Sequence, residues 1–172
     1  MKNTWRIPQS APVISPAMLH PQFDRTRAGA AHVVRLRDTY RMVYWGSDSE
    51  NLNYILQAEA PVDQPNSWQP LGTALIGPQA NSDHNCRGPG FPFLLPVTPD
   101  NWLLYFTGWG RRADGKLPNT TGVAVSNDAG KNWRYHSEHP VIPLDRPYDA
   151  EGIDDQRRSY PTIVSDNGAL HC

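Results

Sequence analysis

Residues 40–46 read Tyr-Arg-Met-Val-Tyr-Trp-Gly, and residues 102–108 repeat this pattern as Trp-Leu-Leu-Tyr-Phe-Thr-Gly. A second phrase recurs with a similar spacing: a tryptophan followed by a short apolar segment that closes on a proline. It runs from Trp5 to Pro16, from Trp68 to Pro78 and from Trp133 to Pro143. The tryptophans are 63 and 65 residues apart, and the closing prolines 62 and 65. Strand-like phrases that recur at a nearly fixed period indicate that one supersecondary unit has been copied along the chain.

The composition is that of one ordinary domain rich in tight turns. The chain has 172 residues and a formal net charge of -1, so charge gives no reason to expect nucleic acid or a membrane surface as a partner. Seventeen prolines and 13 glycines are dispersed among six tryptophans and seven tyrosines, and this aromatic content argues against disorder. Two cysteines, Cys86 and Cys172, exclude a disulfide framework.

The N-terminal stretch lacks the apolar core of a secretory signal, and no apolar run approaches the roughly 18 residues of a membrane helix. We therefore expect a cytoplasmic protein, with an extracellular location left open if the N-terminus is truncated.

Apolar residues alternate or form short bursts, and no segment has a helical period. The expected strands of the first copy cover residues 31–36, 40–45, 53–58 and 68–76. Those of the second copy cover residues 91–95, 102–107 and 122–126, with a last strand that opens near Trp133. A third copy begins at residue 160 and turns at Asp166-Asn167-Gly168, a strong hairpin signal.

Four antiparallel strands in each repeat of about 60 residues are typical of a β-propeller blade. A β-sandwich is the alternative, but it would not require whole phrases to recur. We predict an all-β, incomplete propeller: a blade tail (residues 1–19), two blades (20–79 and 80–144) and the start of another (145–172). A closed ring requires about four to eight blades, so we expect a fragment or a truncated gene whose remaining blades are missing. Self-association that completes the ring is the other possibility.

The segment from Ser126 to Trp133 matches the pattern S-x-D-x-G-x-x-W and resembles the Asp box of sialidase-like propellers. In such a turn Ser and Asp side chains bond the backbone, glycine supplies a positive φ, and tryptophan packs between sheets. We therefore interpret Asp128 as a structural residue.

Three loops lead into the first strand of a copy, and each carries carboxylates. Aligning Ala31, Pro92 and Pro161 brings residues 23–29, 83–90 and 149–158 together. Each loop also carries an arginine about four residues before the aligned position: Arg27, Arg87 and Arg157. In a propeller these loops point toward the central axis. Converging acids are what glycoside cleavage needs, because one carboxyl group protonates the leaving oxygen and another activates water or attacks the sugar.

The blade phrases resemble the five-bladed propellers of glycoside hydrolase families 43, 32, 62 and 68, the relatives of arabinanases, invertases and levansucrases. The resemblance implies an Asp base or nucleophile, a supporting Asp and a Glu general acid. It assigns these roles to Asp24, Asp83 and Glu151 respectively. The chain lacks the W-x-N-D-P-N-G and R-D-P strings of the family, and its acids precede the strands. Each of the three could instead cap a loop.

Other residues are candidates for substrate binding, and each has a structural alternative. His84 could orient a sugar hydroxyl or be a solvated loop residue, and His32 could face the cavity or pack. The three arginines could hold a carboxylate or phosphate group, or form salt bridges. Trp45 and Trp109 could stack on a sugar ring or pack between blades. We expect no cofactor and no metal, because Asp83, His84 and Asp149 lack the spacing of a ligand set.

The leading hypothesis is a glycosidase that acts on an oligo- or polysaccharide. The first alternative is a non-catalytic propeller that binds a carbohydrate or a protein. The second is a sialidase-like exoglycosidase, suggested by the Asp box and the arginines. Whether cleavage inverts or retains configuration depends on the separation of the carboxyl groups and is left open.

Overall fold

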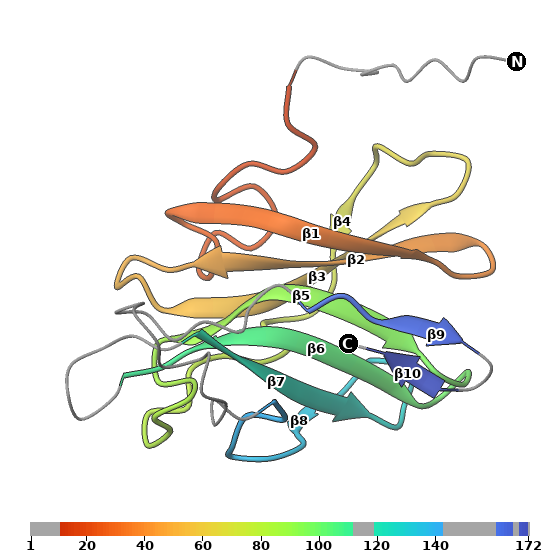
Figure 1. Cartoon of the computed structure of the whole chain (residues 1–172). Coiled ribbons are helices and arrows are strands. Elements are labelled where there is room, and N and C mark those ends of the chain that lie inside the picture. Colours follow the sequence, from red (N-terminus) through yellow and green to blue (C-terminus); the bar gives the residue numbers. More distant parts are fainter. Residues whose placement is uncertain (1–10, 112–118, 143–160, 167–168, 172) are drawn as a thin grey trace, which may run out of the picture.

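A computed structural model describes residues 11–111, 119–142, 161–166 and 169–171 (Figure 1). This described part is all-β, as predicted, and contains two four-stranded antiparallel sheets. The first blade consists of β1 (Arg27–Arg35), β2 (Thr39–Ser47), β3 (Asn53–Pro61) and β4 (Gln69–Pro70). The second blade consists of β5 (Gly88–Pro96), β6 (Trp102–Trp109), β7 (Asn119–Ser126) and β8 (Arg134–Tyr135). Within the described residues, no helix is long and apolar enough to cross a membrane.

A separate hairpin follows the second blade. It pairs β9 (Val164–Asp166) with β10 (Ala169–His171), and Ala169 lies opposite Asp166. The hairpin predicted around residues 166–168 is therefore confirmed by the strands on either side of the turn. The limits of the blade tail, the two blades and the next blade stay a prediction.

The fourth strand of the first blade is shorter than predicted. The sequence favoured a strand over residues 68–76, but β4 contains only two residues. Pro70 lacks an amide hydrogen and Gly72 has φ +60, so the ladder cannot continue regularly past them. The chain returns to the sheet at Ile76, which forms an isolated bridge with Ile55.

The two blades repeat one another down to a local distortion. In both inner strands the pairing register shifts, between Gly29 and His32 in β1 and between Gly90 and Phe93 in β5. Each shift contains one non-glycine residue in the left-handed region, Ala30 with φ 45 and Phe91 with φ 46. The same β-bulge has therefore been copied with the blade, and it fixes which residues of the two inner strands are equivalent.

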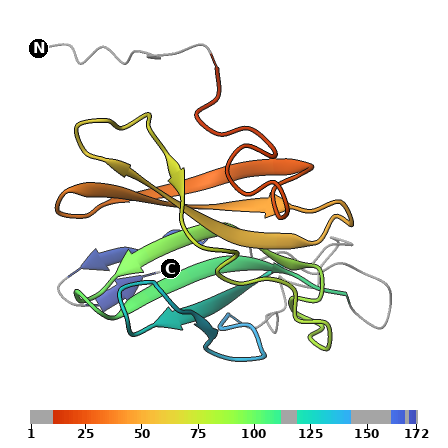
Figure 2. The ribbon, with the colours of Figure 1, turned by 180° about the vertical axis from the view of Figure 1, so that it is seen from behind.

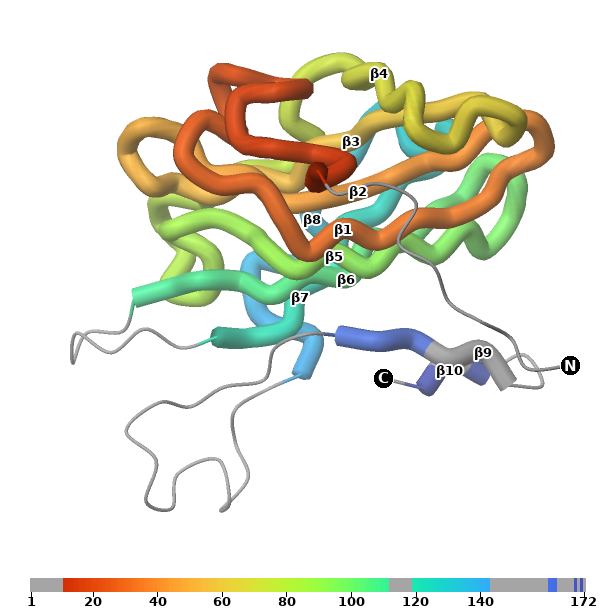
Figure 3. Tube along the Cα trace, turned by 90° about the horizontal axis from the view of Figure 1, so that it is seen from above, coloured from red at the N-terminus to blue at the C-terminus, as the bar shows by residue number. Residues whose placement is uncertain are grey.

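The blades pack face to face, with their inner strands next to each other (Figures 1 and 3). Strand β5 contacts β1, β2 and β3 of the first blade. The core between the blades is built from buried side chains of both: Val43, Ile55, Ile76, Leu94, Trp102, Leu104, Phe106 and Ala124. Seen from behind, the two sheets again lie one above the other (Figure 2). Contacting inner strands in successive sheets are the arrangement of neighbouring propeller blades.

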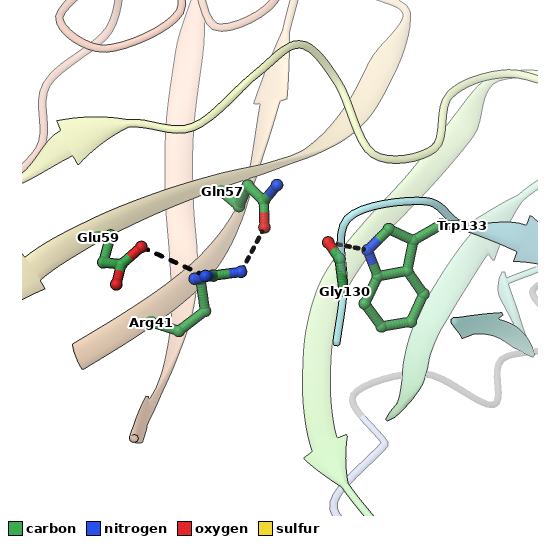
Figure 4. A network of polar contacts seen from close by, with 5 residues as sticks. All are labelled: Arg41, Gln57, Glu59, Gly130 and Trp133. Atoms are coloured by element: carbon green, nitrogen blue, oxygen red, sulfur yellow. Dashed lines mark hydrogen bonds and ion pairs between the residues drawn. The ribbon is translucent and has the colours of Figure 1, made fainter. Parts of the chain in front are cut away.

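An ion pair supports the junction of the blades (Figure 4). The guanidinium of Arg41 donates hydrogen bonds to Gln57 Oε1 at 3.1 Å and to Glu59 Oε2 at 3.2 Å. Its carbon lies 5.6 Å from the centre of the Trp102 ring in the second blade. Arg41 therefore joins the polar edge of β3 to an aromatic side chain across the interface.

A second apolar cluster lies on the opposite face of the first blade. Its buried members are Leu19, Met42, Tyr44, Leu56, Ala58, Ala60 and Trp68. Met42 and Tyr44 alternate along β2 with Val43, which belongs to the core between the blades. This alternation means that β2 presents apolar side chains on both faces, as expected for a strand buried on both sides.

The turn from Ser126 to Trp133 is held by its own polar groups. The Ser126 hydroxyl accepts a hydrogen bond from Gly130 N (2.9 Å), and Asp128 Oδ1 accepts one from Asn132 N (2.9 Å). Trp133 Nε1 donates to the Gly130 carbonyl at 3.0 Å (Figure 4). Hydrogen bonds from Asn132, with a further one from Ser126, lower the pKa of Asp128 to about 2. Asp128 therefore holds the turn in its ionised form.

Candidate functional site

The candidate site lies where the inner strands begin. At this end of the blades the loops before β1 and β5 join their strands, and β2 and β6 finish. The pairs Arg27–Ser47 and Gly88–Trp109 mark this end in the first and second blade.

The first predicted acid, Asp24, is enclosed by protein. Its side chain is 0% exposed, and Oδ2 accepts hydrogen bonds from the Tyr44 hydroxyl at 2.9 Å and from His20 N at 3.2 Å. Oδ1 is buried and has no hydrogen-bond partner among the described residues. Burial and the neighbouring carboxylate raise the pKa of Tyr44, so its hydroxyl stays protonated and donates. Within the described part of the chain Asp24 anchors the loop before β1.

Gly46 in β2 makes room for this acid. A Cβ atom at position 46 would lie 2.7 Å from Asp24 Cβ, closer than side chains approach one another. The loop before β1 therefore rests directly on the backbone of β2.

Asn85, and not Asp83, occupies the equivalent place in the second blade. Because Arg27 corresponds to Gly88, the residue three positions earlier in each loop is Asp24 or Asn85. Asn85 is also fully buried, and its amide donates to the Tyr135 hydroxyl at 2.9 Å. The prediction that Asp83 takes the second equivalent place is wrong by two residues.

Asp83 itself is exposed. Its backbone carbonyl accepts a hydrogen bond from Arg111 N at 3.0 Å. The structure therefore leaves the carboxylate of Asp83 open to solvent, whereas that of Asp24 is enclosed. Glu151 and Arg157 lie outside the described residues.

His84 is buried and is not the solvated loop residue that was one of its two predicted interpretations. Its side chain is buried, its Nδ1 is hydrogen-bonded to the Thr120 hydroxyl, and its ring stacks on Phe106 with 5.9 Å between centroids. Burial, together with the charge of His139, lowers the pKa of His84 to about 4. The imidazole is therefore neutral at neutral pH and packs in the interior.

His32 also belongs to the packing between the blades. Its Nδ1 accepts a hydrogen bond from Leu94 N at 3.1 Å, and its ring stacks on Phe93 at 4.1 Å. Burial lowers the pKa of His32, which favours the neutral ring that this hydrogen bond requires. The structure agrees with the packing interpretation of His32.

The arginines are not in register. Arg27 is exposed at the start of β1, and its equivalent in β5 is Gly88 rather than Arg87. Arg87 is half-buried and donates from Nη2 to the Asn51 carbonyl at 3.3 Å. The register agrees with the alignment of Ala31 with Pro92, but it places Gly88 at the position of Arg27, so Arg87 lies one residue too early to match it.

The predicted tryptophans do come together, and a third aromatic residue joins them. Trp45 and Trp109 meet edge to face with 5.2 Å between ring centroids. Phe91 lies 5.9 Å from Trp45 and 5.5 Å from Trp109. All three side chains are half-buried and lie at the end where the inner strands begin. We call them the aromatic cluster.

The sequence predicted no role for Phe91 beyond a strand. The signal that could have found it is the β-bulge after Gly90, which the first blade repeats with Ala30. A Cβ atom at Gly90 would lie 2.5 Å from the Trp109 ring, so the glycine lets the indole lie on β5. Within the described ranges, no three His, Cys, Asp or Glu side chains are grouped so that they could hold a metal ion.

No protein-family model matches the chain. It is similar to two uncharacterized proteins of Mycobacterium tuberculosis, from the strains CDC 1551 / Oshkosh and ATCC 25618 / H37Rv. The identity to each is 38% over 69 residues, which are 40% of this chain and 21% of the relative.

Two solved structures share the fold. A candidate glycoside hydrolase from Bacteroides ovatus ATCC 8483 matches with a TM-score of 0.60 and 19% identity over 79% of this chain and 41% of the neighbour. A glycosyl hydrolase from Bacteroides ovatus matches with a TM-score of 0.56 and 15% identity over 70% of this chain and 33% of the neighbour. The chain thus spans less than half the length of each relative and neighbour. These likenesses support a glycoside hydrolase-like fold and a partial propeller.

Proposed function

We propose that this protein is a propeller glycosidase that cleaves glycosidic bonds in an oligo- or polysaccharide by acid/base catalysis with carboxyl groups. The fold supports the proposal, because both structural neighbours carry the name of glycoside or glycosyl hydrolases. The observation that carries it is the aromatic cluster at the end where the inner strands begin.

Aromatic side chains offer a large, rigid apolar face, and a sugar ring has a complementary face of C–H groups. In the aromatic cluster, Trp45 comes from the first blade, whereas Phe91 and Trp109 come from the second. All three are half-buried and not fully enclosed. The cluster is therefore held in place by both blades and keeps part of its surface exposed.

The reaction requires two carboxyl groups on either side of the scissile bond. In this proposal Glu151 is the general acid and Asp83, whose carboxylate is exposed, is the base or nucleophile. Asp24 supports them from the interior by fixing the loop before β1 through Tyr44 and His20. The roles of Asp83 and Asp24 follow from their exposure, because an enclosed carboxylate does not reach a sugar, whereas that of Glu151 follows from the resemblance alone.

The test uses the protein as encoded by its natural gene and a panel of aryl glycosides and polysaccharides. Asp83→Asn and Glu151→Gln should each lower kcat by about 10²–10⁴-fold, the usual contribution of a positioned acid or base. Binding of an oligosaccharide should remain. Asp38→Asn is the matched control, because Asp38 is an exposed carboxylate in the turn after β1. Trp109→Ala should raise KM at least several-fold with a smaller change in kcat.

Two results would overturn the proposal. Oligosaccharide binding without hydrolysis of any substrate in the panel would indicate a non-catalytic binding propeller. Release of sialic acid from a reporter substrate would indicate a sialidase-like exoglycosidase instead.

A further inference from the structure

Two faces of the structure are equivalent. One is the face of the second blade that packs against the first blade, and the other is the outer face of the first blade, which carries the same kinds of segment. The segment at residues 74–78, the second strap, lies against the second blade and carries Ile76 into the core between the blades. The segment at residues 12–16, the first strap, carries Ile14 against the outer cluster of the first blade. Both straps are tied in the same way to the loop that follows them. Ala17 N donates to the Asp24 carbonyl at 2.9 Å, and Gln79 N donates to that of Asn85 at 3.1 Å.

Between the blades, the second strap is hydrogen-bonded to β3 of the first blade, the blade that precedes it in the sequence. Ile55 N in β3 donates to the Ile76 carbonyl at 3.0 Å, and Leu75 N donates to the Ile55 carbonyl at 2.8 Å. The equivalent groups of the first strap are Val13 N and the carbonyl of Ile14. Neither takes part in a hydrogen bond within the described residues. The first strap therefore offers the same donor and acceptor without the strand that would use them.

The side chains on the outer face of the first blade are likewise less covered than their equivalents between the blades. Leu94 in β5 is 1% exposed because the first blade covers it, whereas its equivalent in β1, Val33, is 45% exposed. Phe91 contacts Trp45 of the first blade, whereas its equivalent Ala30 borders a cavity. This cavity of about 180 Å³ is lined by the first strap, the start of β1, Met42 and Tyr44. An apolar cavity of roughly 150 Å³ accommodates a benzene ring, so the space suits one large apolar side chain.

We propose that this outer face docks another four-stranded propeller blade. The third strand of that blade exchanges two backbone hydrogen bonds with Val13 and Ile14, as β3 does with the second strap. It places one large apolar side chain, the counterpart of Ile55, into the cavity, and its neighbouring strand covers Val33. The partner is identified by this chemistry: an antiparallel sheet that is apolar on the docking face. The proposal does not depend on the glycosidase activity.

The test places a photo-cross-linking amino acid, p-benzoylphenylalanine, at Val33 in the protein produced from its natural gene. Val97, which is 54% exposed beyond the end of β5, is the matched control position. Irradiation should join position 33 to a peptide outside residues 1–172 that has the alternating pattern of a propeller strand. The yield should be at least tenfold that at position 97.

Equal yields at the two positions, a cross-link into a second copy of residues 1–172, or a cross-linked peptide from a protein without propeller strands would each overturn the proposal. Val33→Lys provides a second measurement. In the 172-residue chain alone it should leave Tm almost unchanged, because Val33 is largely exposed there. In the protein from the natural gene it should lower Tm, whereas Val97→Lys should not. An unchanged Tm in both settings would contradict a docked blade.

Discussion

Acidification is expected to destabilise the fold through one buried imidazole, that of His84. The buried ring stacks on Phe106 and is hydrogen-bonded to Thr120, both in the second blade. Burial and the charge of His139 lower its pKa from 6.5 to about 4. Because the native state holds the neutral ring, the unfolded chain binds a proton more readily between these two values. The contribution of His84 is therefore fully present above pH 6.5 and is lost as the pH falls toward 4.

The size of the effect follows from the shift in pKa. Linkage between an unfolded pKa of 6.5 and a native pKa of about 4 predicts a loss of about 2 kcal/mol between roughly pH 7.5 and pH 5. Urea denaturation followed by tryptophan fluorescence at the two pH values measures this loss. In His84→Gln, which has no titrating ring, most of the loss should disappear even if the variant is less stable overall.

Two controls separate His84 from the other histidines. His136→Gln removes an exposed histidine that follows β8, and its loss of stability should match that of the wild type. Burial is the main cause of the lowered pKa of His84, and His139→Gln removes only the smaller contribution of a nearby charge, so it should make the loss slightly smaller. If His84→Gln lost as much free energy of unfolding as the wild type over this pH range, the assignment of a buried neutral imidazole would be refuted.

Three further predictions concern packing and loops. In a thermal-unfolding assay, Gly122→Ala should destabilise the protein by about 1–3 kcal/mol, because the new Cβ would lie 2.3 Å from the Phe106 ring. Gly72→Ala should cost about 1 kcal/mol in the same assay, because no atom lies within 4 Å of the new Cβ but φ is +60. Asp128→Asn should flatten the loss of stability as the pH falls from about 4 to about 2, because the ionised carboxylate holds its turn and its pKa is about 2; an unchanged acid-unfolding curve would contradict this role. Asp24→Asn should leave the urea midpoint unchanged or raised, because it removes a buried charge at a place where the second blade carries Asn. A strong drop in the urea midpoint would show that the charge itself is required.

The repeat unit was predictable from the sequence because its signals are local. Tryptophans and prolines at a fixed spacing, and alternating apolar residues between turn residues, located both four-stranded sheets and the hairpin of β9 and β10. The fourth strand was overestimated because apolar content at Leu75 and Ile76 indicated a continuous strand. In the structure Pro70 and Gly72 interrupt the ladder, and Ile76 alone returns to it.

The site was less predictable because it depends on the pairing register of the strands and on the burial of individual side chains. The alignment of Ala31 with Pro92 agrees with the structure, but the match between Arg27 and Arg87 was wrong by one residue, because the β-bulges fix Gly88 at the position of Arg27. The same register places Asn85, two residues after Asp83, at the position equivalent to Asp24. Burial of His84 depends on Gly108 and Gly122 on neighbouring strands, since a Cβ at either would lie within 3 Å of the imidazole. A single loop sequence does not show such contacts.

The two blades serve as internal controls for each other. Features that both entrance loops share are expected to serve folding, and features found in one loop alone are candidates for a separate role. Both loops bury a polar side chain at the same place, Asp24 or Asn85, and each leaves one side-chain oxygen without a partner among the described residues. The partner groups differ, however. Asp24 is bonded by Tyr44 of its own second strand, whereas the equivalent of Tyr44 is Phe106 and Asn85 bonds Tyr135 instead. The same fold thus accommodates either a carboxylate or an uncharged amide at this place. The charge at Asp24 is what the first blade adds, and an effect of Asp24→Asn on turnover without an effect on stability would locate its purpose in the chemistry of the site.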